Sequence, residues 1–323
     1  MPRITFVVPV RNDAVRLGQC LASIAANDRR DAYDIVVADN GSTDNSVEVA
    51  RKAGAEVVEL PRVNVAQMRN TAATRATGDL LAFVDADHLL DGHWIDAALD
   101  IFRDATVTAA GAHYTSPPNA NWVQRAYDRF RPKQHGLHDT DWLGSGNLIV
   151  RREAFRRVGG FDASLETCED VDLCNRLRLE GLRLVGDDRL RSVHQGDPSS
   201  LRAVFFGELW RGRSNITVTL RGPWTLGAVP SLAIPMFNLV CLALIAAGAI
   251  ALPWWGPRPL LAGVGGLVAT MSLRIVRVVA GRSVPSAAEF AGTAAVASAY
   301  EVARALALVF RATHRSRRET ARA

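Results

Sequence analysis

Short apolar runs alternate with segments of helical periodicity along the N-terminal third of the chain. Residues 4–10 form a β-rich run, and apolar side chains at helical spacing follow Asp13, a candidate N-cap. The pattern repeats with runs at 34–38, 56–60 and 79–84 and helical segments at 42–53 and 66–76, where Gly54 and Gly78 are the expected helix ends. Strands that are apolar throughout, separated by helices, predict an α/β fold with a mostly parallel sheet covered by helices on both faces.

The balance of polar and apolar residues changes near Asn215. Charged and apolar residues are interleaved before it, whereas long apolar runs dominate after it, in a chain that is 48% hydrophobic overall. A length of 323 residues accommodates a domain of roughly 200 residues and an appended region. The pattern therefore predicts one domain over residues 1–215 and a membrane region over residues 216–323.

Two segments of the second region are predicted to cross a membrane. Residues 229–252 contain no charge and can span a hydrocarbon core of about 30 Å. Residues 260–280 form a weaker span, because Arg274 and Arg277 would each cost roughly 2.5–3.5 kcal/mol at the bilayer centre. Near the end of the helix these arginines can extend to the cytoplasmic side instead.

The next segment, residues 287–310, is apolar overall but contains Glu289, Glu301 and Arg304. A third crossing here would leave the basic tail, residues 311–323, outside the cell, against the positive-inside tendency. An interfacial or buried helix is therefore favoured, and a third transmembrane helix is the alternative.

The arginine-rich tail contributes a large share of the net charge of +5. A basic tail beside an apolar segment fits an anionic membrane surface better than nucleic acid. The four cysteines lack the paired spacing of zinc sites and the density of a disulfide framework, and the apolar run at residues 4–10 is too short for a secretory signal. We expect a multi-pass protein of the cytoplasmic membrane whose first domain lies in the cytoplasm.

Candidate chemistry begins where the fourth strand ends, at Asp85-Ala-Asp87. Alternation along a strand would place both carboxylates on one face. Mg²⁺ and Mn²⁺ take hard oxygen ligands, and one or two carboxylates leave positions open for diphosphate oxygens. The alternative is a turn that happens to contain two aspartates.

Asp39-Asn-Gly-Ser-Thr-Asp44, Gln67-Met-Arg-Asn70 and the Gly78–Asp87 segment occur in an order and spacing that resembles the family 2 glycosyltransferases, whose GT-A fold is Rossmann-like. The resemblance covers residues 1–100 as a nucleotide-sugar half. It implies that Asp39 holds the nucleobase with Pro9 and Arg11 beside it, that Asp85 lies near the ribose or sugar, and that Asp87 reaches the metal. Arg69 would meet the diphosphate, unless it is an ordinary arginine on the helix surface.

The acceptor half, residues 101–215, resembles the same family at Trp142-Leu-Gly-Ser-Gly-Asn147, in the segment 155–162 and at Glu169-Asp170. Glycines such as Gly146 let backbone approach a ligand, and Asn147 offers a donor and an acceptor to sugar hydroxyls. The alternative is a plain tight turn before a strand at residues 148–150.

Local sequence makes Glu169 and Asp170 the first turn of a helix that Gly181 ends, where acids are stabilised by the helix dipole. The resemblance implies more, because the family uses the second acid of this pair as the general base. Asp170 is thus the expected base and Glu169 the residue that orients acceptor or sugar, while Asp172 is expected to be a solvated helix residue.

His194 follows a short strand-like run, and a lone histidine at such a place is usually structural. Related GT-A enzymes often complete metal coordination with a histidine at this point in the chain, so the resemblance makes His194 the partner of Asp87 for Mn²⁺ or Mg²⁺. The remaining histidines, His88 among them, are expected on the surface or in loops.

The resemblance implies an inverting single displacement, in which an acceptor hydroxyl attacks the anomeric carbon of a nucleotide-diphosphate sugar, with a UDP-sugar favoured. The acceptor would be lipid-linked or a glycan. Residues 206–215 depart from the Gln-x-x-Arg-Trp motif of processive relatives, which favours transfer of a single sugar. Transfer to a polyprenyl phosphate and a catalytically silent membrane scaffold are the alternatives.

Overall fold

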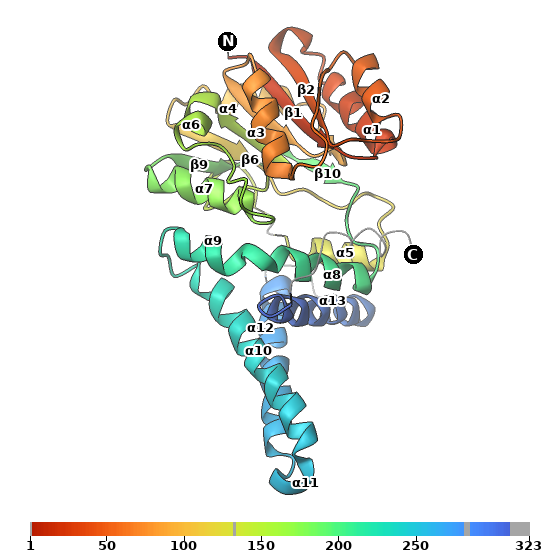
Figure 1. Cartoon of the computed structure of the whole chain (residues 1–323), viewed down its shortest axis with the longest axis vertical. Helices are drawn as coiled ribbons and strands as arrows, with labels where there is room; N and C mark the ends of the chain where they lie inside the picture. The colour runs from red at the N-terminus through yellow and green to blue at the C-terminus, as the bar shows by residue number, and fades with distance from the viewer. Residues whose placement is uncertain (1, 132–133, 281–284, 311–323) are drawn as a thin grey trace. The chain divides into compact units, whose positions relative to one another are not determined.

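The computed structural model describes residues 2–131, 134–280 and 285–310, and it divides into two compact units (Figure 1). Among the described residues, the sheet unit comprises 2–117, 134–196 and 221–223, and the helical unit comprises 118–131, 197–220, 224–280 and 285–310. The predicted boundary at residue 215 lies at the start of α9 (Asn215–Arg221), but segments 118–131 and 197–220 pack with the later helices.

The sheet unit is built on an eight-stranded sheet of order β3-β2-β1-β4-β8-β6-β9-β7. Its strands are β1 Ile4–Val10, β2 Tyr33–Asp39, β3 Glu56–Glu59, β4 Leu80–Val84, β6 Val107–Gly111, β7 His138–Asp139, β8 Asn147–Arg151 and β9 Arg183–Gly186. The first four strands in chain order are parallel, β8 runs antiparallel between β4 and β6, and β7 is antiparallel to β9. A separate antiparallel pair joins β5 (His88–Leu90) to β10 (Ser192–His194).

Helices cover both faces of this sheet, as predicted. They are α1 Ala14–Ala25, α2 Ser46–Lys52, α3 Val65–Arg75, α4 Trp94–Ile101, α6 Arg152–Arg157 and α7 Glu169–Leu179, with single 3₁₀ turns at η1 Arg30–Ala32 and η2 Asp188–Leu190. Alternate residues of β1 point to opposite faces. Phe6 and Val8 pack with side chains of α1 and α4, whereas Val7 packs with side chains of α3, α6 and α7. The α/β fold class is confirmed.

The helix limits depart from the sequence pattern in three places. Helix α2 begins at Ser46, because the preceding turn is held by Asp44, whose carboxylate accepts from the Ser46 amide and hydroxyl. Asp13 occupies the N-cap position of α1, but its carboxylate pairs with Arg16 and does not cap the helix. Gly54 ends α2 with φ +79°, whereas α3 ends at Arg75, before Gly78.

The helical unit consists of α5 (Trp122–Asp128), α8 (Leu201–Arg211), η3 (Gly212–Ser214), α9, α10 (Val229–Ile250), α11 (Leu252–Trp255), α12 (Arg258–Val279) and α13 (Ala287–Leu306). Helices α10 and α12 form a hairpin that turns at α11 (Figure 1). Both are long and apolar enough to cross a membrane, in agreement with the two predicted spans at 229–252 and 260–280.

Helix α13 packs on α5 and α8, where Val123, Val204 and Val296 form one buried cluster. Its Glu301 is 1% exposed and accepts hydrogen bonds from Arg274 and from Asn238 Nδ2. Arg274, which the sequence pattern placed near the end of a span so that it could extend to water, is paired within the helical unit. The predicted basic tail, 311–323, lies outside the described residues.

Replacing Gly78 by alanine should destabilise the sheet unit. A Cβ atom at Gly78 would lie 2.5 Å from the Arg3 carbonyl oxygen and 2.8 Å from the Thr5 amide nitrogen, and neither backbone atom can move without disturbing β1. We expect a loss of about 1–3 kcal/mol, seen as a lower midpoint in thermal unfolding followed by circular dichroism. Gly92→Ala is the matched control, because a Cβ there meets nothing within 4 Å. Equal midpoints for the two variants would contradict this account of Gly78.

Candidate active site

The nucleobase residue expected from the sequence, Asp39, ends β2 and is 2% exposed. Its Oδ2 atom accepts a hydrogen bond from the Ser42 amide at 2.9 Å, whereas Oδ1 is buried and has no hydrogen-bond partner among the described residues. Strand β1 places Pro9 beside Ala38 and Val10 beside Asp39, so that exposed Arg11 follows directly at the same sheet edge. A buried acceptor atom without a protein donor fits a ligand that supplies an N–H group.

Arg69 joins the two halves of the sheet unit. The residue is 2% exposed, and its guanidinium donates to Asp85 Oδ1 at 2.7 Å and to Glu169 Oε1 at 2.8 Å. The ring of Phe161 lies 5.5 Å from the guanidinium carbon. This burial excludes the alternative of a helix-surface arginine, and the two ion pairs bring the Asp85 loop and the start of α7 to one place.

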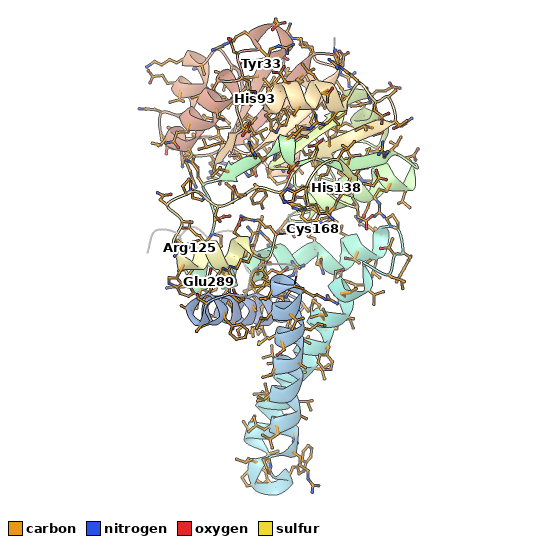
Figure 2. The ribbon with its side chains drawn as sticks, turned by 180° about the vertical axis from the view of Figure 1, so that it is seen from behind. Tyr33, His93, Arg125, His138, Cys168 and Glu289 are labelled. Atoms are coloured by element: carbon orange, nitrogen blue, oxygen red, sulfur yellow. The ribbon has the colours of Figure 1, made fainter. Side chains whose placement is uncertain are left out.

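Glu169 and Asp170 form the first turn of α7, after Cys168 in the left-handed conformation at φ 62° (Figure 2). Asp170 Oδ2 accepts from the Ser145 amide at 3.3 Å, and Oδ1 accepts from the Val171 amide at 2.8 Å. Burial raises the pKa of Asp170 above its ordinary value, even though these two hydrogen bonds favour the carboxylate. Burial and the charge of Asp170 also raise the pKa of Glu169, against the opposing effect of Arg69.

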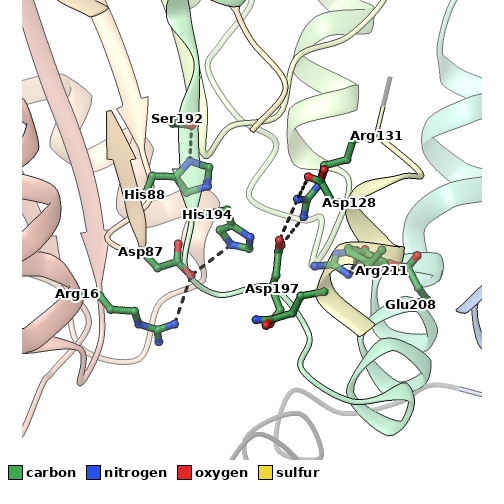
Figure 3. Close-up of polar contacts among 12 residues, drawn as sticks. Arg16, Asp87, His88, Asp128, Arg131, Ser192, His194, Asp197, Glu208 and Arg211 are labelled. Atoms are coloured by element: carbon green, nitrogen blue, oxygen red, sulfur yellow. Dashed lines mark hydrogen bonds and ion pairs between the residues drawn. The ribbon is translucent and has the colours of Figure 1, made fainter. Parts of the chain in front are cut away.

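Asp87, His88 and His194 form a group whose possible ligand atoms all lie within 4.8 Å of one another. His194 Nε2 lies 3.3 Å from Asp87 Oδ2, and Arg16 Nη1 lies 3.8 Å from the same oxygen (Figure 3). Burial raises the pKa of Asp87, but the hydrogen bond and charge of His194 and the charges of His88 and Arg16 outweigh it, so the pKa of this carboxyl is lowered. One carboxylate and two imidazoles suit a divalent transition metal.

His88 was expected on the surface or in a loop, and this prediction is wrong, because His88 is a buried residue of β5. The side chain is 1% exposed, and its Nδ1 atom lies 3.0 Å from Ser192 Oγ (Figure 3). The antiparallel pairing of β5 with β10 sets His88 directly opposite His194. The signal that could have identified it is its position immediately after Asp85-Ala-Asp87, but the strand pairing is invisible in the sequence pattern.

The two aspartates of Asp85-Ala-Asp87 do not lie on one strand face, as alternation had suggested. Strand β4 ends at Val84, and a turn closed by the His88 amide donating to the Asp85 carbonyl at 3.0 Å carries both residues. Asp85 therefore binds Arg69, whereas Asp87 contacts His194. The turn separates the two carboxylates into different roles.

Residues 5–159 match the model of the family described as glycosyl transferase family 2. This part of the chain is therefore a glycosyltransferase family 2 domain. Glycosyltransferase AglE of Haloferax volcanii is 25% identical over 249 residues, which cover 72% of this chain and 80% of AglE. Pre-mycofactocin glycosyltransferase of Mycobacterium tuberculosis is 31% identical over 194 residues, 56% of this chain but only 40% of that relative.

Solved structures support the same GT-A fold. The mannosyltransferase PcManGT of Pyrobaculum calidifontis, in complex with GDP-Man and Mn²⁺, aligns with a TM-score of 0.61 at 22% identity over 94% of this chain and 86% of its own. TarS 1-349 of S. aureus in complex with UDP-GlcNAc aligns with a TM-score of 0.54 at 14% identity, over 94% of this chain and 91% of its own. The prediction of a family 2 glycosyltransferase enzyme is confirmed.

In this glycosyltransferase the glycine loop serves the site in a different way from the one expected. A Cβ atom on Gly146 would lie 2.8 Å from His88 Nε2 and 3.1 Å from Asp85 Oδ2, so glycine is required for these side chains to approach. Asn147 is 1% exposed; its Oδ1 accepts from Trp94 Nε1 at 3.0 Å, and its Nδ2 donates to the Leu190 carbonyl at 2.6 Å. Its side-chain amide is buried and bound to core residues, contrary to the predicted contact with sugar hydroxyls.

Asp172, on α7, also differs from the prediction. It was expected to be solvated, but it is 4% exposed and pairs with Arg176 at 2.8 Å, one helical turn later. Arg176 also donates to the Val158 carbonyl, so this pair ties α7 to the end of α6. The charge at position 172 therefore has a structural role, as a buried pair beside the site.

Replacing Arg69 by methionine should destabilise the fold, because two carboxylates lose their shared cation. We expect the free energy of unfolding to fall by about 3 kcal/mol. The lost ion pair with Asp85 should contribute less than the one with Glu169, because Asp85 is more exposed. The pKa of Glu169 in the folded state, already raised, would rise further above its unfolded value. A carboxyl group whose pKa is raised by folding favours the folded state below its unfolded pKa, and this contribution is lost as the pH rises through the folded pKa. The free energy of unfolding should therefore fall more at neutral pH than near about pH 4.

Urea denaturation of both proteins at both pH values measures this difference. Arg75→Met, an exposed position on the same helix, is the control and should change stability little. A loss of stability in Arg69→Met that does not depend on pH would argue against the proposed charge interaction.

Proposed function

We propose that the protein transfers a single sugar from a nucleotide diphosphate to an acceptor hydroxyl, with inversion of the anomeric centre, at the cytoplasmic face of a membrane. The observation that carries this proposal is the double ion pair of Arg69, because it gathers the donor-side residue Asp85 and the acceptor-side residue Glu169 in one place. Family membership supplies the reaction class.

The donor is proposed to be a UDP-sugar. Asp39 has one buried carboxylate oxygen without a partner among the described residues, while the other oxygen is bound to the Ser42 amide. The uracil ring has a single imide N–H that matches one acceptor, whereas guanine offers two adjacent donors on this edge. Related folds have been observed with GDP-Man and with UDP-GlcNAc, so both donors belong in a test.

A divalent cation is proposed to bind Asp87, His194 and His88. The presence of Mn²⁺ in the PcManGT complex supports a metal at this kind of site. When bound, the cation supplies Lewis-acid stabilisation of the charge on the departing diphosphate. Two imidazoles favour Mn²⁺ over Mg²⁺, because Mg²⁺ prefers an all-oxygen shell. Of the two cations predicted from the sequence, Mn²⁺ is therefore the one proposed.

Asp170 is proposed as the general base. The acceptor hydroxyl gives its proton to the Asp170 carboxylate as its oxygen bonds to the anomeric carbon, and the carbon–oxygen bond to the nucleotide diphosphate breaks on the opposite face. Burial raises the pKa of this carboxyl and makes it a stronger proton acceptor when ionised. Glu169, held by Arg69, is proposed to orient the acceptor or sugar.

The membrane location rests on α10 and α12, which among the described residues have the length and composition to cross a bilayer. Orientation follows from charge, because Arg277 lies in the last turn of α12 and favours the cytoplasmic side. An acceptor that is lipid-linked, or a glycan presented at that surface, is consistent with such an anchor.

Substitution of the two acids should separate chemistry from donor binding. We expect Asp170→Asn to lower the transfer rate by about 10²–10⁴-fold and leave donor affinity unchanged, because it removes only the base. Asp87→Ala should lose metal-dependent nucleotide binding as well. Calorimetric titration of UDP with Mn²⁺ into both variants, beside release of the diphosphate, measures the split. Equal losses of nucleotide binding in the two variants would contradict these separate roles of Asp170 and Asp87.

Removing the unexpected imidazole should change metal selectivity. His88→Gln keeps the side-chain size but loses a nitrogen ligand, so Mn²⁺ affinity should fall by about tenfold or more while Mg²⁺ affinity changes less. Calorimetry with each metal alone measures both values. His93→Gln, at an exposed loop histidine labelled in Figure 2, is the control. Unchanged Mn²⁺ affinity in folded His88→Gln would exclude His88 from the metal site.

A further inference from the structure

Trp142 is a large aromatic side chain next to the proposed base. It is 44% exposed, and it precedes the loop whose Ser145 amide donates to Asp170. A methyl group placed on Gly144 would lie 3.8 Å from the Trp142 ring and 3.9 Å from Asp170 Oδ2. The ring and the carboxylate therefore border the same small space, and whatever contacts the ring lies beside the group that accepts the proton.

The loop that carries Trp142 is fixed to α7 by contacts on either side of it. Asp141 pairs with Arg178 at 2.7 Å, and the Leu143 amide donates to Cys174 Sγ at 3.3 Å. The His113 ring lies edge-on to the indole, with centroids 6.0 Å apart and an interplanar angle of 71°. An exposed aromatic ring that is held in place in this way loses little conformational freedom when a ligand stacks on it.

We infer that Trp142 is the stacking platform of an acceptor subsite for a pyranose ring, and that the acceptor nucleophile is a sugar hydroxyl. This inference rests on the proposed sugar transfer and specifies its acceptor. The C–H groups on one face of a pyranose are apolar and weakly positive, and they complement the negative face of an indole. The hydroxyls at the ring edge remain available to Asp170.

The charges around Asp170 disfavour a phosphate nucleophile. Glu169 and Asp85 add carboxylates to the neighbourhood, and both arms of the Arg69 guanidinium already bind them. A dianionic phosphate at Asp170 would meet the like charges of Asp170 and Glu169, and both terminal nitrogens of Arg69 are already bound to carboxylates. A neutral sugar hydroxyl meets no such repulsion, so the structure favours a glycan or glycolipid acceptor over a polyprenyl phosphate.

The full-length protein in lipid nanodiscs provides the test. Two rates are measured with a panel of UDP-sugars and GDP-mannose in the presence of Mn²⁺. The first is hydrolysis of the donor by water, and the second is transfer to octyl glycosides of glucose, galactose, mannose and N-acetylglucosamine below their micellar concentrations. Farnesyl phosphate serves as the phosphate acceptor. Trp142→Ala and Trp142→Phe are compared with the exposed control Trp224→Ala.

We expect transfer to at least one glycoside, with an acceptor KM raised by about tenfold in Trp142→Ala, a smaller rise in Trp142→Phe, and none in Trp224→Ala. Calorimetric titration of UDP with Mn²⁺ should give the same affinity in all four proteins, which shows that the variants fold and bind the donor. An unchanged acceptor KM in Trp142→Ala overturns the inference, and so does the absence of transfer to every glycoside while donor hydrolysis persists. Failure of the unaltered protein to hydrolyse any donor overturns the proposed function, and the inference with it.

Discussion

The arrangement of the active site depends on the charge of Arg69. Its guanidinium is buried on α3 and binds Asp85, which follows β4, and Glu169, which begins α7. Removing an arginine from water is costly unless its donors meet acceptors, and two carboxylates meet that need. Because these carboxylates come from distant parts of the chain, satisfying one buried cation also sets the distance between the donor side and the acceptor side of the site.

The other charged residues divide into two environments on either side of this link. Asp87 is surrounded by Arg16, His88 and His194, and its pKa is lowered, so it is suited to hold a cation at neutral pH. Asp170 is buried beside Glu169, and its pKa is raised, so it is suited to accept a proton. Burial and neighbouring charge thus shift the pKa values of two carboxyl groups of similar chemistry in opposite directions.

The helical unit contains a second buried polar group, among helices that are otherwise apolar. Asn238 on α10 donates to Glu301 on α13 at 2.9 Å and accepts from Thr270 on α12 at 2.7 Å, and Arg274 of α12 pairs with the same glutamate. The Arg274 guanidinium also lies 4.2 Å from the centre of the Tyr300 ring. Each of these polar groups has a partner, so they set the register of three helices whose apolar surfaces alone would pack less specifically.

Local pattern in the sequence was sufficient for most of the elements, and the resemblance to a known family named the candidate site residues. The first four strands, the helices between them and the two apolar spans follow from periodicity, because burial of one face or of both leaves a direct trace in residue order. Asp39, Asp87 and Asp170 were named from motifs at strand and helix ends.

Tertiary structure decided what depends on contacts between distant segments. The pairing of β5 with β10 placed His88 beside His194. The Asn147 amide bonds to Trp94, and Arg69 is a buried link between two carboxylates. Hydrogen-bond partners and burial are properties of the folded chain that spacing along the sequence does not record.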